Sequence, residues 1–195
     1  VGLDVQLAKI LLKPFGTKPK TVLLGLLLVI GVFSMFMSNT ATAAMMLTFL
    51  TPILLTLPAD GGGRISLALA IPIAANIGGM GTPIGTPPNA IALGALQEAG
   101  YNITFVDWML RMVPFVIVML VIAWFLLSKM FPFKAKKIEL NIEAKPTKTT
   151  PFQKYVVWVT FGLTILLWVG ENWFKVNSNI VAMIPFAVFS ATGIL

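Results

Sequence analysis

Long apolar stretches separated by short polar turns run along the whole chain. They cover residues 21–37, 40–57, 65–77, 89–96, 105–131, 152–173 and 180–195. A helix needs roughly 20 residues, each rising about 1.5 Å, to cross about 30 Å of hydrocarbon. Segments 105–131 and 152–173 reach this length alone, and we expect each to be a membrane-spanning helix. The pattern predicts an all-α polytopic membrane protein.

The shorter apolar segments combine in pairs. Segments 21–37 and 40–57 share one polar turn, which predicts a re-entrant helical hairpin over residues 21–57. Segments 65–77 and 89–96 are each too short to cross the bilayer, but together they are long enough. The residues between them are rich in glycine and proline, which interrupt helices. We therefore predict one spanning helix over residues 65–99 that is broken at its middle.

Composition agrees with a location in the bilayer. Hydrophobic residues make up 57% of the 195 residues, charged residues make up 11%, and the mean hydropathy is +0.91. A soluble protein of this size needs a charged exterior that these residues cannot supply. The chain has no cysteine and no histidine, which excludes zinc–thiolate sites and removes the commonest general base. We therefore do not expect an enzyme, because Ser38 as a nucleophile would lack a visible partner.

The positions of the basic residues predict the orientation in the membrane. All but two of the 14 lysine and arginine residues lie before the hairpin, between it and the broken helix, or in and beside the connector 132–151. Cytoplasmic ends of spanning segments collect such residues, so we place 1–20 and 132–151 in the cytoplasm. We interpret residues 1–20 as an interfacial amphipathic helix and 132–151 as a linker. The net charge of +7 then favours contact with anionic membrane lipid, not nucleic acid.

Polar residues at bilayer depth gather first at the tip of the predicted hairpin, between Ser34 and Thr42. Backbone groups cannot remain unsatisfied against lipid, so this tip must line a cavity or pack within protein. We expect Asn39 and Thr40 to cap the second helix, while the first helix ends near Ser38 with free carbonyls. Ser34 and Ser38 are four residues apart, which predicts that both hydroxyls share one face. The tip then offers donors and acceptors; the alternative is a tightly packed helix pair.

The second polar place is the predicted break at residues 78–88. Pro87 and Pro88 suit the first turn of a new helix, with Thr86 as its cap. An interrupted helix exposes an amide end and a carbonyl end, each equivalent to about half a charge. The first can hold an anion and the second a small cation such as Na⁺. Neither 21–57 nor 65–96 contains a charged residue, which favours metal-cation coupling or plain exchange over proton relay. The alternative is a structural kink.

These two motifs resemble those of the divalent anion:sodium symporters, the family of INDY-type dicarboxylate and citrate carriers. The turn Ser38-Asn39-Thr40 resembles the SNT signature of that family, and the loop 85–89, Gly-Thr-Pro-Pro-Asn, resembles its companion loop. The resemblance implies that residues 21–131 belong to the transport domain of the first of two inverted repeats. Residues 152–195 would begin the second repeat. Because the chain opens with Val1 and ends in an apolar run, we expect a longer protein.

The resemblance also implies roles for individual residues. It places Na⁺, the coupling ion, at Ser34, Ser38, Asn39 and Gly85. It places a substrate carboxylate at Asn39 and Thr40, near Thr86 and Pro87. The second repeat would supply a second SNT motif and the remaining half of the substrate pocket.

The function implied is that of a secondary transporter for di- or tricarboxylates in the cell membrane. Such carriers work by alternating access, as sodium symporters or anion exchangers, and the family implies a homodimer. The residues do not distinguish succinate, malate, 2-oxoglutarate, citrate or sulfate. The alternative function is an anion channel or passive pore, in which the same hairpin would line a continuous path.

Overall fold

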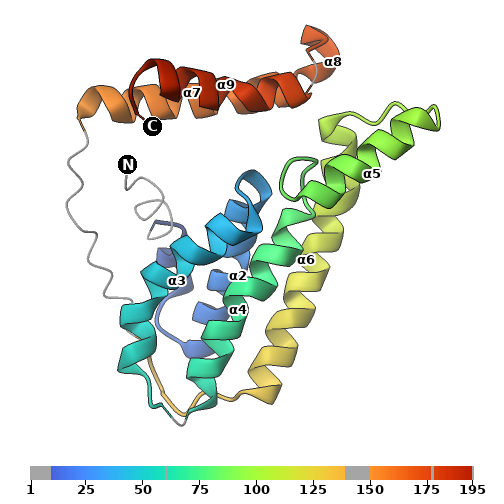
Figure 1. Cartoon of the computed structure of the whole chain (residues 1–195). Helices are drawn as coiled ribbons and strands as arrows, with labels where there is room; N and C mark the ends of the chain where they lie inside the picture. Colours follow the sequence, from blue (N-terminus) through green and yellow to red (C-terminus); the bar gives the residue numbers. More distant parts are fainter. Residues whose placement is uncertain (1–9, 60, 139–149, 177, 195) are drawn as a thin grey trace.

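The computed structural model describes residues 10–59, 61–138, 150–176 and 178–194, and this part of the chain is helical with no strands (Figure 1). Four of its helices, α2, α3, α6 and α7, are long and apolar enough to cross a membrane. The prediction of an all-α, multi-pass membrane protein is confirmed. In chain order the elements are the short 3₁₀ helix η1 (Lys13–Phe15), α2 (Pro19–Phe36), α3 (Asn39–Thr56), α4 (Gly62–Gly79), α5 (Pro87–Glu98), α6 (Phe105–Met130), α7 (Pro151–Val169), α8 (Glu171–Phe174) and α9 (Ser178–Ala191).

Helix α4 is at the centre of the main bundle. It packs most extensively on α2 and also contacts α3 and α6, so the arms of the hairpin converge on it (Figure 1). A Cβ atom on Gly78 would lie 2.3 Å from the carbonyl oxygen of Gly31. The backbones of α2 and α4 are therefore in direct contact at Gly31 and Gly78, and a residue with a Cβ atom at position 78 would not fit there. The hydrophobic core of the bundle includes the buried side chains of Val22, Leu26, Ile30, Leu50, Leu67, Ala74 and Leu120.

The predicted hairpin and the predicted helix break are both present. Helix α4 ends at Gly79 and α5 begins at Pro87, with turns between them. Both prolines that open α5 occupy first-turn positions, where a missing N–H costs nothing within the helix. In Figure 1, α5 continues beyond the bundle in a direction different from that of α4. The break thus leaves the end of α4 and the start of α5 near the hairpin tip.

Helices α7 and α9 pack on each other and lie across the hairpin end of the bundle (Figure 1). Two aromatic contacts anchor this pair: the Phe105 and Trp168 rings stack with centroids 4.8 Å apart, and the Phe36 and Trp168 rings stack with centroids 6.3 Å apart. The backbone N–H of Phe105 also donates to Glu171 Oε2 at 2.8 Å. The sequence did not predict this transverse arrangement, because it depends on aromatic contacts between distant segments.

The apolar segment 152–173, predicted as one helix, is divided in two. Helix α7 ends at Val169, and the N–H of Gly170 bonds back to the Leu166 carbonyl at 2.9 Å. The short helix α8 then begins at Glu171. Glycine has little preference for a helix interior, so Gly170 is a natural ending point.

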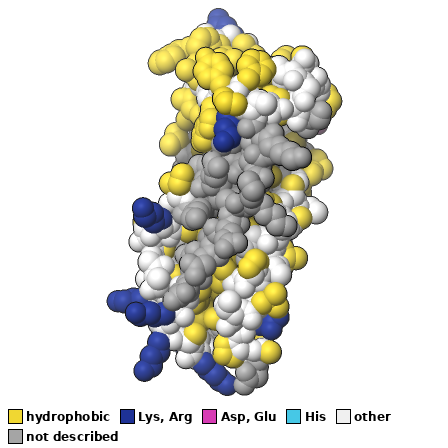
Figure 2. Space-filling model, turned by 90° about the vertical axis from the view of Figure 1, so that its left-hand side faces the viewer, with side chains coloured by type: hydrophobic (Ala, Val, Ile, Leu, Met, Phe, Trp, Pro, Cys, Tyr) yellow, Lys and Arg dark blue, Asp and Glu magenta, His cyan; other side chains and the backbone are white. Residues whose placement is uncertain are grey.

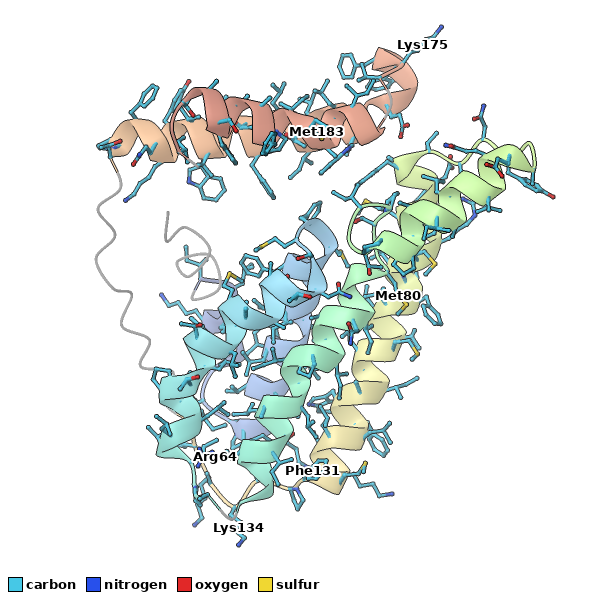
Figure 3. All side chains as sticks on the ribbon, viewed as in Figure 1. Arg64, Met80, Phe131, Lys134, Lys175 and Met183 are labelled. Atoms are coloured by element: carbon cyan, nitrogen blue, oxygen red, sulfur yellow. The ribbon has the colours of Figure 1, made fainter. Side chains whose placement is uncertain are left out.

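Basic residues gather mostly at the end of the bundle away from the hairpin tip. Figure 3 places Arg64 and Lys134 together at that end and Lys175 at the opposite end. Figure 2 shows lysine and arginine side chains mostly in the lower half of one face, with apolar side chains above. Lys154 is separate from this group because it belongs to α7, contrary to the prediction. The physical reason is the transverse placement of α7 described above.

The predicted interfacial helix and linker are described only in part. Residues 1–9 of the first and 139–149 of the second lie outside the described residues. Ile10 and Leu11 are exposed, whereas Leu12 is buried in the core of the bundle. The N–H of Ile138 donates to the carbonyl of Thr17 at 2.9 Å. The start of the linker therefore lies beside the segment that precedes α2, and the domain boundaries stay predictions.

A capping box opens α6 and provides a first test of the fold. Thr104 Oγ1 accepts from the Asp107 N–H at 3.2 Å, and Asp107 Oδ2 accepts from the Thr104 N–H at 3.1 Å. We expect Thr104→Ala to lower the free energy of unfolding by about 1 kcal/mol, because loss of an N-cap leaves helix N–H groups without partners. The measurement is the thermal midpoint of the detergent-solubilised complete protein.

The matched control is Thr48→Ala. Thr48 is exposed, and its hydroxyl bonds only within its own helix, to the Ala44 carbonyl at 3.0 Å. Thr48→Ala should leave the midpoint unchanged. Equal midpoints for the two variants would contradict a stabilising role for the capping box.

Candidate cation and anion site

The hairpin tip and the helix break meet in space. Ser34 Oγ lies 2.7 Å from the Ala75 carbonyl in α4, and Asn39 Nδ2 donates to Asn76 Oδ1 at 3.0 Å. From the loop after α4, Thr82 Oγ1 donates to the carbonyl of Met35 in the last turn of α2. These bonds connect residues 37 to 47 positions apart in the sequence. The two polar places therefore form one site within the bundle.

Ser38 is the residue that caps α3. It lies in an extended conformation, and its Oγ accepts from the Ala41 N–H at 3.2 Å. Asn39 and Thr40 are the first two helical residues, so the prediction that they cap the helix was wrong. The reason is local: α2 ends at Phe36, and the extended turn brings the Ser38 hydroxyl over the open amides. As a result, the Asn39 side chain is available for other contacts.

The expectation that Ser34 and Ser38 share one helix face was also wrong. Ser38 lies beyond the end of α2, so helical spacing no longer relates the two side chains. Ser34 is fully buried against α4, whereas Ser38 is exposed. Of the two serines predicted to bind sodium, Ser38 is thus the one whose hydroxyl caps a helix, whereas the Ser34 hydroxyl faces the oxygens of Ala75 and Asn39.

The Ser34 hydroxyl faces two acceptors with a single hydrogen. Its Oγ is 2.7 Å from the Ala75 carbonyl oxygen and 2.9 Å from Asn39 Oδ1. The hydroxyl hydrogen can be donated well to only one of these acceptors. The other acceptor oxygen then lies against Ser34 Oγ with no hydrogen between the two atoms. Small hard cations are held by such groups of hydroxyl, amide and carbonyl oxygens. The oxygen set fits Na⁺.

Two glycines allow further oxygens to approach this group. A Cβ atom on Gly79 would lie 2.3 Å from Asn39 Oδ1, and a Cβ on Gly85 would lie 2.4 Å from the Gly79 carbonyl oxygen. The same position on Gly85 would be 3.0 Å from the Ser34 carbonyl oxygen. The structure therefore brings Ser34, Asn39 and Gly85 together, and it adds the Gly79 carbonyl, which the sequence did not single out.

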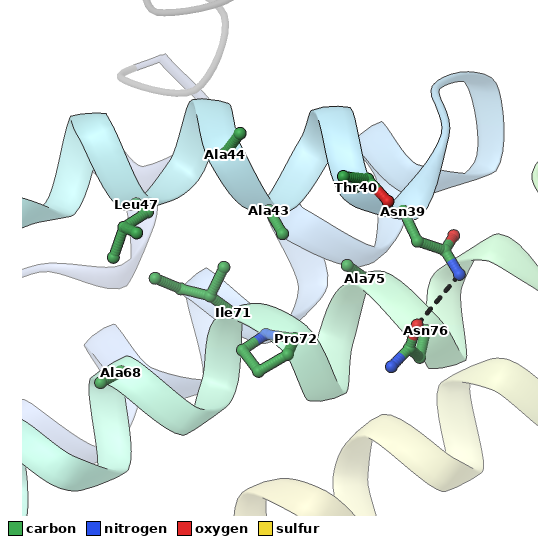
Figure 4. Close-up of a pocket in the computed structure, with 10 residues that line it drawn as sticks. All are labelled: Asn39, Thr40, Ala43, Ala44, Leu47, Ala68, Ile71, Pro72, Ala75 and Asn76. Atoms are coloured by element: carbon green, nitrogen blue, oxygen red, sulfur yellow. Dashed lines mark hydrogen bonds between the residues drawn. The ribbon is translucent and has the colours of Figure 1, made fainter.

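A cavity of about 510 Å³ opens beside Asn39, between α3 and α4 (Figure 4). Asn39, Thr40 and Asn76 form its polar part, and Figure 4 shows Asn39 and Asn76 joined by their hydrogen bond. The other lining residues are apolar: Ala43, Ala44, Leu47, Ala68, Ile71, Pro72 and Ala75. Such a cavity can take a small ligand whose charged group lies at the amide side chains.

Thr86 and Pro87 do not line this cavity. Thr86 occupies the predicted N-cap position of α5, but its side chain makes no cap bond. The next two residues are prolines without N–H groups, and the N–H of Asn89 bonds to the Thr86 backbone carbonyl at 3.1 Å. No N–H therefore remains in the first turn for the Thr86 hydroxyl.

Asn89 and Trp108 hold the break and were not predicted as site residues. Asn89 Nδ2 donates to the carbonyls of Gly79 and Thr82, each at 2.8 Å, and Trp108 Nε1 donates to the Met80 carbonyl at 3.0 Å. Asn89 ends the Gly-Thr-Pro-Pro-Asn loop, which was the available signal for it. Within the described residues, no cluster of three or more His, Cys, Asp or Glu could hold a metal ion.

A helical hairpin that faces a broken helix in a multi-pass membrane protein is the arrangement that the site and fold define. The chain belongs to the citrate transporter family, whose sequence model matches residues 1–195. The resemblance to divalent anion:sodium symporters is confirmed by relatives of that kind. These relatives are named as transporters and not as enzymes.

Three similar proteins illustrate the range of the family. The "Low-affinity phosphate transporter PHO90" of Saccharomyces cerevisiae is 36% identical over 185 residues, which cover 92% of this chain and 20% of that protein. The "Sodium-dependent high-affinity dicarboxylate transporter 3" of Caenorhabditis elegans is 33% identical, covering 87% and 34% of the two chains. The "Sodium-dependent dicarboxylate transporter SdcS" of Staphylococcus aureus is 32% identical, covering 88% and 36%. This chain thus spans only a minor part of each relative.

Proposed function

We propose that this chain forms part of a secondary transporter that moves di- or tricarboxylates across the cell membrane by alternating access. The observation that carries this proposal is the contact between the hairpin tip and the helix break. There, neutral oxygens from the buried Ser34 and Ala75 and from the partly buried Asn39 lie close together beside an open cavity with amide side chains. A cation and an anion can be bound side by side in such a place.

Asn39 is the residue that couples the two ligands in this proposal. Its Oδ1 lies against Ser34 and Gly79, where the cation would bind, and its Nδ2 is on the Asn76 side, at the cavity. An anion entering a low-dielectric cavity is costly unless its charge is compensated. A bound Na⁺ supplies that charge, with Ser34, Ser38, Asn39 and Gly85 as its proposed site. The substrate carboxylate would then bind at Asn39 and Thr40.

Thr86 and Pro87 would approach the substrate from the other side of the break. The amide end of α5 offers few N–H donors, since Pro87 and Pro88 have none and the Asn89 N–H is bonded. Hydrogen bonds to the anion therefore fall mainly on the hairpin tip and on the Thr86 hydroxyl. The second repeat would complete the pocket, and we propose a homodimer on the basis of the family.

Phosphate is the competing substrate, favoured by the 36% identity to PHO90, whose printed name is that of a phosphate transporter. Phosphate and dicarboxylates are both small oxyanions that hydroxyl and amide groups can bind. The apolar lining of the cavity favours the carboxylates, because their carbon skeleton gains from contact with Leu47 and Ile71.

Transport by the complete protein in proteoliposomes tests this proposal. We expect an inward Na⁺ gradient to drive uptake of radiolabelled succinate or citrate at least about tenfold faster than a choline gradient, since that corresponds to about 1.4 kcal/mol of coupling. Unlabelled substrate inside should accelerate uptake by counterflow if exchange operates. The same vesicles should be tested with radiolabelled phosphate.

Each other outcome identifies a different function. Uptake of phosphate without uptake of carboxylates would contradict the proposed substrate class. Flux that follows the membrane potential, without saturation or counterflow, would indicate an anion channel or passive pore. Carboxylate counterflow that is equal in Na⁺ and choline would indicate an exchanger without cation coupling.

A further inference from the structure

Thr82 links the helix break to the hairpin and has no part in the function proposed so far. It is fully buried, and its Oγ1 donates to the Met35 carbonyl in the last turn of α2. Its own carbonyl accepts from Asn89 Nδ2 at 2.8 Å and from the Gly85 N–H at 3.3 Å. One residue therefore bonds through its side chain to α2 and through its backbone to the loop and α5.

The two segments that Thr82 joins carry atoms of the proposed cation site. Met35 follows Ser34 directly in α2, and Gly85 is the residue held by the Thr82 carbonyl. A Cβ on Gly85 would be 3.0 Å from the Ser34 carbonyl oxygen, so these segments are in close contact. In the described ranges, the Thr82 hydroxyl makes the hydrogen bond that ties the loop 80–86 directly to α2. The separation of Ser34 and Gly85 therefore depends on it.

We infer that Thr82 is a positioning residue for the coupling cation: its hydroxyl holds the loop against α2 and so sets the spacing of the oxygens around Ser34 and Gly85. This inference rests on the proposed function. Thr82 does not touch the ion itself. Because cation affinity depends on the spacing of the ligand oxygens, a loosened loop should weaken cation binding more than it slows the saturated transporter.

The hydroxyl, not the shape of the side chain, is the feature to test. Valine has nearly the same shape as threonine but cannot donate, so Thr82→Val would leave the Met35 carbonyl without its partner. Serine keeps the donor and loses only a methyl group. Thr164 offers a matched control, because it is buried in α7 and its hydroxyl bonds within its own helix, to the Thr160 carbonyl at 2.7 Å.

The experiment measures substrate uptake by the complete protein against Na⁺ concentration at saturating substrate. We expect Thr82→Val to raise the half-saturating Na⁺ concentration about tenfold, with a maximal rate within about twofold of the wild type. Thr82→Ser and Thr164→Val should keep both values within about twofold of the wild type. Thermal stabilisation by Na⁺ should show the same order, with Thr82→Val needing more Na⁺ for the same rise in midpoint.

Thr82→Cys keeps the proposal testable if Thr82→Val does not fold. Its thiol is a weaker donor of similar size to serine, so we expect a half-saturating Na⁺ concentration about threefold above the wild type. A lower maximal rate or thermal midpoint with unchanged half-saturating Na⁺, in either Thr82→Val or Thr82→Cys, would overturn the inference. If the wild type itself shows no Na⁺ dependence, the proposed coupling fails and the inference fails with it. If wild-type uptake saturates with Na⁺ and the Thr82 variants have the same half-saturating Na⁺ concentration, the inference about Thr82 is refuted while the proposed function stands.

Discussion

Asn39→Ala is expected to abolish sodium-dependent succinate uptake by the complete protein, with a loss of about 100-fold or more. The change removes Oδ1 from the oxygen group at Ser34 and removes Nδ2 from the cavity. Hydrogen bonds to charged ligands are worth about 1.5–3 kcal/mol each, and this one side chain would contact both the cation and the anion. Initial uptake rates in proteoliposomes, corrected for the amount of reconstituted protein, measure the effect.

Thr164→Ala is the control for this prediction. Its hydroxyl donates to the Thr160 carbonyl within α7 and is in none of the hydrogen bonds that join the hairpin tip to the break, so uptake should remain near the wild-type rate. If the two substitutions reduced uptake equally, the assignment of the site to the hairpin tip would be wrong. A loss in Asn39→Ala that is restored at high Na⁺ would limit the role of Asn39 to the cation.

Gly78→Ala is expected to destabilise the whole bundle. The new Cβ would lie 2.3 Å from the Gly31 carbonyl oxygen and 2.4 Å from the Gly31 Cα, and both atoms belong to the backbone of α2. Neither can move without separating α2 from α4, which form the most extensive helix contact of the bundle. Overpacking of this kind costs about 1–3 kcal/mol, and the separation would also pull Ser34 away from Ala75. We expect a thermal midpoint several degrees lower and greatly reduced transport.

Gly94→Ala is the matched control, in α5. A Cβ there would meet nothing within 4 Å, so the substitution should preserve the midpoint or raise it slightly through the better helix propensity of alanine. Equal midpoints for Gly78→Ala and the wild type would show that α2 and α4 are farther apart than described.

Much of the fold follows from local features of the sequence. The Ser38-Asn39-Thr40 turn lies between two apolar runs, and the glycine- and proline-rich segment 78–88 lies between two others. The prolines of the second segment interrupt a helix, and serine, asparagine and threonine in the first favour a turn and a new helix start, so both effects act within one or two turns. For this reason the hairpin and the break could be predicted without any knowledge of packing.

The capping pattern could be predicted only in part. Ser38, Asn39 and Thr40 are all suitable near a helix start, and the choice of Ser38 as the cap depends on where α2 ends. Helix α2 ends at Phe36, whereas the four-residue spacing from Ser34 to Ser38 assumes that the helix continues to Ser38. At the break, the two prolines placed the start of α5 correctly, but they also removed the N–H groups that a Thr86 cap would need.

The amino-acid sequence by itself determined the class of protein, the helical segments and the two polar motifs, because hydrophobic length and turn residues act locally. Only the tertiary structure decided that Ser34 meets Ala75, that Asn39 lies between Gly79 and Asn76, and that α7 crosses the end of the bundle. These contacts join residues far apart in the chain, and they depend on how closely the helices pack. The absence of side chains at Gly31 and Gly78 permits that approach, and the approach brings the oxygens of the hairpin and the break into one site.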